Sequence, residues 1–170
     1  MSATEARATL SPDGPALLIG PVTLPRYLDR PQIVTRPTPN QLALAEYDRW
    51  GGRLDDNVTR VLAQNLAAQL GTSRVAVFPR EQRLANAIQI SLDIARFERV
   101  GEAGVVELEA QWSLYPPDRR QGPGVGTSRV SVRPAGEGMA ATVAAMSEAL
   151  DQVAREIAAE ARKLPAPATN

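Results

Sequence analysis

Two segments in the middle of the chain alternate apolar and polar residues, and this pattern constrains the fold more than any other feature. In the first segment, the apolar positions are Ile88, Ile90, Leu92 and Ile94. In the second, they are Val106, Leu108, Ala110, Trp112 and Leu114. Strict alternation predicts strands with one buried face and one solvated face. The short Gly-containing connection over 99–104 predicts an antiparallel hairpin, and the opposite phase of Phe97 predicts a bulge near Ala95 and Arg96.

Two further segments have helical spacing. Over 54–70 the apolar face comprises Leu54, Val58, Val61, Leu62, Leu66 and Leu70, and Gly71 follows as a natural helix terminator. From 139 to about 162 the apolar stripe comprises Met139, Val143, Met146, Leu150, Val153, Ile157 and Ala161. Core packing is the simplest interpretation of this second stripe, and a contact between copies of the chain is the alternative.

Shorter extended runs are expected at 16–24, 32–36, 41–46, 74–78 and 125–132. Gly20-Pro21 in the first run predicts an edge strand or a bulge, and Pro37-Thr38-Pro39-Asn40 predicts a hairpin between the next two. Together these elements predict an α+β fold: a two-layer domain with a mostly antiparallel sheet and two helices packed on one face. We expect residues 1–13 to be a flexible tether remnant, 14–162 a single domain and 163–170 a disordered tail.

The composition argues against catalysis. The chain has no His and no Cys, and Lys163 is its only lysine, so the commonest general base, metal ligands and nucleophiles are missing. Glu107 and Glu109 fall on one strand face about 7 Å apart, a separation that glycosidases use, but a solvated strand face is much commoner. The 19 basic and 19 acidic residues cancel, which is unlike a nucleic-acid-binding protein. We therefore expect no enzyme activity, no metal and no cofactor.

Candidate contact residues lie before and after the predicted hairpin. Arginine and aromatic side chains dominate protein interfaces, and a Pro/Arg/Tyr-rich loop with a Trp before a helix supplies both. The candidate partner-binding residues are Tyr27, Leu28, Arg30, Pro31, Arg36 and Trp50. A solvated loop and a core Trp are the alternative interpretations.

Three segments resemble a known family. They are LPRYLDRPQIVTR at 24–36, Trp50 followed by VTRVLAQNL at 58–66, and VVELEAQWSLY at 105–115. The chain resembles the PqiC-type ABC-transport auxiliary lipoprotein family over residues 16–162. The resemblance implies a non-catalytic periplasmic domain, anchored to the outer membrane by an N-terminal lipid. Its implied partners are an MCE-domain protein and associated inner-membrane transport components, which move lipids or maintain membrane integrity.

Members of that family carry a signal peptide and a lipid-bearing cysteine, so we expect this sequence to begin after that cysteine. Two mechanisms stay open. In the first, the loop at 27–36 and Trp50 dock the MCE protein or a neighbouring copy of the chain. In the second, the domain carries lipid itself, which requires an apolar groove between the sheet and the helices.

Overall fold

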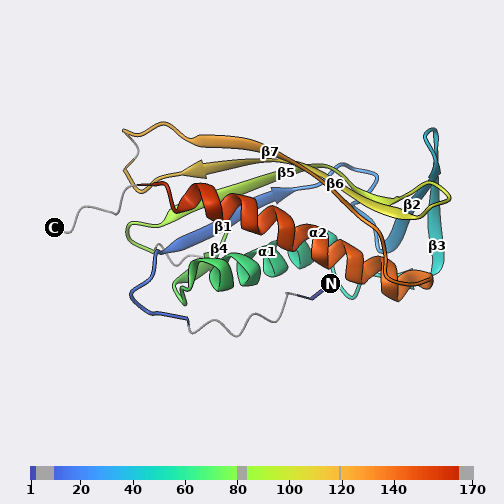
Figure 1. Ribbon diagram of the computed structural model, residues 1–170, viewed down its shortest axis with the longest axis horizontal. Helices are drawn as coiled ribbons and strands as arrows, with labels where there is room; N and C mark the ends of the chain where they lie inside the picture. Colours follow the sequence, from blue (N-terminus) through green and yellow to red (C-terminus); the bar gives the residue numbers. More distant parts are fainter. Residues whose placement is uncertain (3–9, 80–83, 119, 165–170) are drawn as a thin grey trace.

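The computed structural model describes residues 1–2, 10–79, 84–118 and 120–164 (Figure 1). In chain order the elements are β1 (Leu17–Thr23), β2 (Gln32–Thr38), β3 (Gln41–Arg49), α1 (Leu54–Leu70), β4 (Val75–Val77), β5 (Ile88–Val100), β6 (Val105–Tyr115), β7 (Gly124–Val132) and α2 (Gly138–Ala161). The flexible tether and the disordered tail are predictions that fall mainly on 3–9 and 165–170, outside the described residues.

The seven strands form one mixed sheet. β5 is the central strand, and β6 pairs with it along one edge. β1 and β2 share its other edge: β1 pairs with the first half of β5, and β2 pairs with its last residues. β1 is parallel to β4 and β5, and β2 is parallel to β5. The longest ladders, β5–β6 and β6–β7, are antiparallel, as is the β2–β3 hairpin. The predicted α+β fold is confirmed, and its sheet combines both kinds of pairing.

Irregular strand positions match the sequence pattern. The register of β5 against β6 shifts between Ile94 and Arg96, so the predicted bulge is confirmed and Phe97 is fully buried. β1 shifts against β5 between Ile19 and Val22, on either side of Pro21. Of the two roles predicted for that proline, the bulge is therefore the one observed, because β1 has neighbours on both sides.

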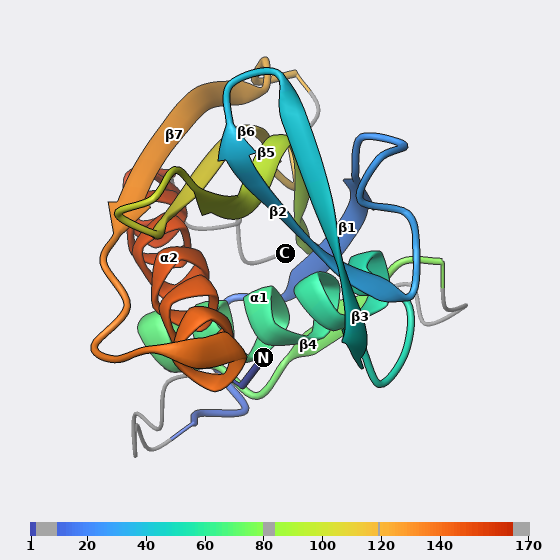
Figure 2. The same ribbon diagram turned by 90° about the vertical axis from the view of Figure 1, so that its right-hand side faces the viewer.

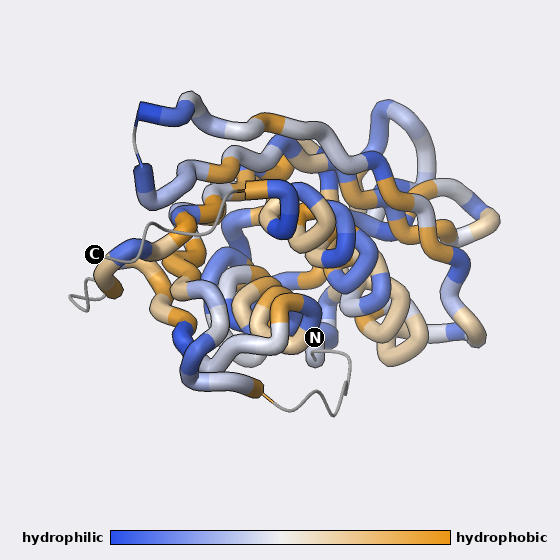
Figure 3. Tube along the Cα trace, turned by 60° about the vertical axis from the view of Figure 1, so that its left-hand side comes forward, coloured by the Kyte–Doolittle hydropathy of each residue, from blue (hydrophilic) through white to orange (hydrophobic). Residues whose placement is uncertain are grey.

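The helices lie side by side and cover one face of the sheet (Figures 1 and 2). α1 packs on β1 and β4, and α2 packs on β5, β6 and β7. Hydrophobic positions recur along both helices and along the strands beside them (Figure 3). α1 has the predicted bounds, and Gly71 ends it with a φ of 63° in the left-handed region that glycine tolerates. Among the helices of the described residues, none is long and apolar enough to cross a membrane.

Candidate functional site

A fully buried carboxylate organises one end of the sheet. On β5, the residues that pair with β1 end at Asp93, and the residues that pair with β2 begin at Arg99. Glu98 lies between these two segments. Because Phe97 points into the core, the neighbouring Glu98 side chain points to the opposite side of the strand. Its exposed fraction is 0%. A charge buried in this way requires partners, and the nearby loop and hairpin supply them.

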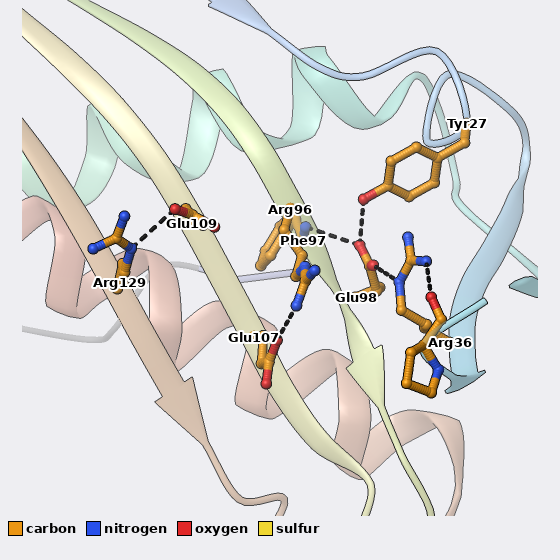
Figure 4. A network of polar contacts seen from close by, with 9 residues as sticks. Tyr27, Arg36, Arg96, Phe97, Glu98, Glu107, Glu109 and Arg129 are labelled. Carbon is orange, nitrogen blue, oxygen red and sulfur yellow. Dashed lines mark hydrogen bonds and ion pairs between the residues drawn. The ribbon is translucent and has the colours of Figure 1, made fainter. Parts of the chain in front are cut away.

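Three donors satisfy the Glu98 carboxylate (Figure 4). The Tyr27 hydroxyl donates at 2.6 Å, Nε of Arg36 donates at 2.7 Å, and the backbone N–H of Phe97 donates at 3.1 Å. Arg36 also donates to the carbonyl of Pro39 at 3.2 Å, and its guanidinium lies 5.5 Å from the centre of the Tyr27 ring. Together these contacts tie the β1–β2 loop and the β2–β3 turn to β5.

Burial and bonding keep the two donor side chains protonated. Burial, together with the hydrogen bond to Glu98, raises the pKa of Tyr27 to about 12. The hydrogen bond to Glu98 also raises the pKa of the Arg36 guanidinium above its usual value. The cluster therefore holds one full negative and one full positive charge in a partly desolvated place, where a missing partner would be costly.

Three of the candidate contact residues face inward. Tyr27 and Arg36 are half-buried and bonded to Glu98, as described above. Leu28 has an exposed fraction of 2% and belongs to the hydrophobic core. These three side chains therefore hold the loop in place, and little of their surface is left for a partner.

The other three candidates meet near the surface. Arg30 and Pro31 are exposed in the loop between β1 and β2. Trp50 is half-buried and packs against the core, and its backbone N–H donates to the carbonyl of Pro31 at 2.8 Å. This bond joins the segment between β3 and α1 to the loop, so the backbone at Trp50 lies beside the backbone at Pro31 and its neighbour Arg30.

Sequence reasoning missed Glu98. In the alternating pattern it reads as a polar residue on the solvated face, as Glu107 and Glu109 do. The signal that could have identified Glu98 was the change in apolar phase at Phe97. A bulge turns the residues that follow it, so their polar side chains need not face solvent and another segment can cover them. What covers Glu98 is a loop some 70 positions earlier in the chain, and no local pattern predicts that contact.

Glu107 and Glu109 have structural partners of their own. Arg96 binds Glu107 at 2.6 Å and Arg129 binds Glu109 at 2.9 Å, each across neighbouring strands (Figure 4). All four side chains are at least a third exposed, as expected for a solvated strand face. Within the ranges that the structure describes, no group of three or more His, Cys, Asp or Glu residues is placed to hold a metal ion.

A groove of about 680 Å³ runs between α1 and the edge of β4 that pairs with no strand of the described residues. Its apolar lining comes from Leu10, Ala63, Ala67, Val75, Val77, Phe78 and Pro79. Asp56, Arg60 and Gln64 from successive turns of α1 also line it. It is an apolar hollow between a helix and the sheet, as the lipid-carrier alternative requires.

Solved structures share this fold. An uncharacterized protein superposes with a TM-score of 0.74 and 22% sequence identity, covering 86% of this chain and 92% of its own. Protein XCC0632 from Xanthomonas campestris superposes with a TM-score of 0.70 and 23% identity, covering 94% of this chain and 93% of its own. Among curated proteins, none matches the sequence.

The sequence model of one family matches residues 1–158, which is nearly the whole described domain. That family is described as the ABC-type transport auxiliary lipoprotein component. The match confirms the resemblance that the segments at 24–36, 58–66 and 105–115 carry. This chain belongs to the ABC-type transport auxiliary lipoprotein family.

Proposed function

We propose that this protein is a non-catalytic docking component of an MCE-type lipid-transport system, which holds the MCE-domain protein at the outer membrane. Membership of an auxiliary transport family supports a role beside a transporter. The resemblance of residues 24–36 and 58–66 to PqiC-type proteins supports the MCE partner. Periplasmic placement with an N-terminal lipid anchor is part of the same proposal.

One observation carries the docking role. A fully buried carboxylate fixes the loop that presents Arg30 and Pro31, and it does so through Tyr27 and Arg36. Surfaces whose side chains are ordered before binding lose less conformational entropy when a partner arrives. Arginine and tryptophan supply much of the binding energy at interfaces, and here Arg30 and Trp50 belong to one ordered surface.

The candidate residues therefore divide into two groups. Arg30, Pro31 and the exposed part of Trp50 contact the partner. The loop that carries that surface is held in place by Tyr27 and Arg36, which bond to Glu98, and by Leu28, which lies in the core. A neighbouring copy of the chain is the competing occupant, and the experiment below distinguishes it from the MCE protein.

The test is capture of the purified MCE-domain protein by this domain. Arg30→Glu reverses an exposed charge without touching the Glu98 cluster, so the fold is retained and we expect binding at least about tenfold weaker. Arg120→Glu is the matched control, because Arg120 is an exposed arginine beside the opposite end of β6. Equal capture by the wild type and both variants would refute the proposed surface. Loss of self-association in Arg30→Glu, with MCE capture unchanged, would assign the surface to a second copy.

Lipid carriage is the second candidate, and the groove between α1 and β4 favours it. An acyl chain in that groove would contact the apolar lining while its head group met Asp56, Arg60 or Gln64. Native mass spectrometry of protein purified from membranes is the test. A lipid-bound species that disappears in Ala67→Trp, at a partly exposed residue of the groove lining, would support carriage, and a lipid-free protein would exclude it.

A further inference from the structure

β3 is an edge strand with one unpaired side. It pairs with β2 and with no other strand of the sheet in the described residues. The β2–β3 hairpin crosses one end of the molecule, opposite the end where α2 finishes at Ala161 (Figure 1). The backbone N–H and C=O groups on its outer side are therefore open to another extended chain.

The side chains of β3 are unusual for an unprotected edge. Leu42 and Leu44 alternate along the strand with exposed fractions of 40% and 45%. The register against β2 then shifts between Leu44 and Arg49, so the intervening residues bulge away from β2. Tyr47 lies in this bulge and is 93% exposed. Natural edge strands are commonly protected by charged side chains or by a bulge, and in β3 both lie in the second half of the strand. The first half, at Leu42 and Leu44, is therefore the exposed apolar part of the edge where another strand can pair.

The acidic residues beside Tyr47 indicate the charge that a chain pairing with β3 would need. Glu46 and Asp48 are exposed, and in the part of the chain that the structure describes neither takes part in a salt bridge. β3 thus has an apolar half at Leu42 and Leu44 and an acidic half around Tyr47, where two carboxylates outnumber the one cation, Arg49. A chain that fits it carries aliphatic side chains followed by a basic one.

Two ways of pairing β3 with a second copy of itself fit this edge poorly. In a parallel pair the carboxylates of Glu46 and Asp48 would meet the same carboxylates of the other copy. In an antiparallel pair centred on Ala45 they would lie opposite Leu44 and Leu42. Both arrangements place charges against like charges or against apolar side chains.

We propose that β3 binds an extended segment of the docked partner as an added strand, with aliphatic side chains against Leu42 and Leu44 and a basic side chain beside Glu46 and Asp48. This inference rests on the proposed docking function. The two surfaces are continuous, because β3 ends at Arg49, Trp50 follows directly, and the Trp50 N–H is bonded to Pro31.

Strand addition has a signature that side-chain contact lacks. An added strand bonds every second backbone amide of the edge, so hydrogen exchange at residues 41–45 slows with a period of two. We expect at least a tenfold slowing at the bonded amides when the purified MCE-domain protein is bound, measured by NMR. The double variant Glu46→Lys, Asp48→Lys should bind at least tenfold more weakly, and Glu148→Lys on the exposed side of α2 is the matched control.

The outcomes separate the two proposals. If the MCE protein binds and exchange over 41–45 is unchanged, the inference about β3 is wrong and the docking proposal stands. If the MCE protein does not bind, the docking proposal fails. β3 is then tested directly with a synthetic eight-residue peptide, in which Val and Thr alternate and the last two residues are lysines. If saturating peptide leaves amide hydrogen exchange at residues 41–45 unchanged, the inference is overturned. Protection that appears without any partner, on self-association alone, would assign the edge to a second copy and would also overturn it.

Discussion

Replacing Glu98 by Gln tests the reasoning about the buried cluster most directly. Glutamine has nearly the same shape, so the change removes the negative charge without leaving a cavity. One carboxylate oxygen becomes an amide NH₂, so either the acceptor of the Arg36 bond or the shared acceptor of the Tyr27 and Phe97 bonds is lost. The variant therefore asks whether the charge itself holds the β1–β2 loop and the β2–β3 turn against β5.

The expected loss of stability follows from the contacts. The Arg36 side chain is only 18% exposed and Glu98 is fully buried, so Arg36 loses a charge partner that water replaces only in part. Breaking a buried ion pair from one side costs about 3–5 kcal/mol, and the remaining amide oxygen recovers some of this. We expect a loss of about 2–4 kcal/mol in the free energy of unfolding. For a chain of 170 residues this lowers the Tm by roughly 4–16 °C.

Thermal and urea unfolding followed by circular dichroism measures this loss. Glu107→Gln is the matched control: it removes the same charge from a partly exposed ion pair with Arg96, which is worth less than about 1 kcal/mol. A double-mutant cycle with Tyr27→Phe should show coupling, because the Tyr27 hydroxyl donates to the carboxylate that Glu98→Gln neutralises. If Glu98→Gln melts within 2 °C of the wild type, or no lower than Glu107→Gln, the cluster does not hold the loop and the proposed docking surface loses its structural support.

Two further predictions concern stability. A Cβ on Gly126 would lie 2.1 Å from the Trp112 ring, so Gly126→Ala should cost about 1–3 kcal/mol in urea unfolding. Gly122→Ala, with nothing within 4 Å, should match the wild type, and equal values for both variants would show that Gly126 is not tightly packed. The raised pKa of Tyr27, about 12, means that the folded state holds this proton more tightly than the unfolded state, whose pKa is about 10. The resulting stability is present below pH 10 and is lost as the pH rises through 12, by about 1–2 kcal/mol once solvent screening of a half-buried phenol is included. Tyr27→Phe should show a flatter pH dependence of Tm over that interval, and an unchanged slope would contradict the assignment.

The candidate site was only partly predictable from the sequence. Local composition identified the loop and Trp50 as unusual, and the structure places Arg30, Pro31 and Trp50 together near the surface. It also places Leu28 in the core and bonds Tyr27 and Arg36 to a residue more than 60 positions later. Whether an exposed-looking side chain faces solvent or a distant carboxylate depends on long-range packing, which local patterns do not contain.

Local sequence patterns predicted the helices and strands of this protein and the apolar face that each main element buries. Period-two alternation placed β5 and β6, helical spacing placed α1, and the phase change at Phe97 located the bulge, because each signal arises from neighbours within a few residues. Long-range packing places β1 and β2 along one edge of β5 and buries Glu98 between the segments that pair with them. It also leaves β3, within the residues that the structure describes, paired on one side only. Those contacts join residues far apart in the chain, and several pairings of the same strands would bury the same apolar faces. The choice among them rests on how the whole set of strands and helices packs together.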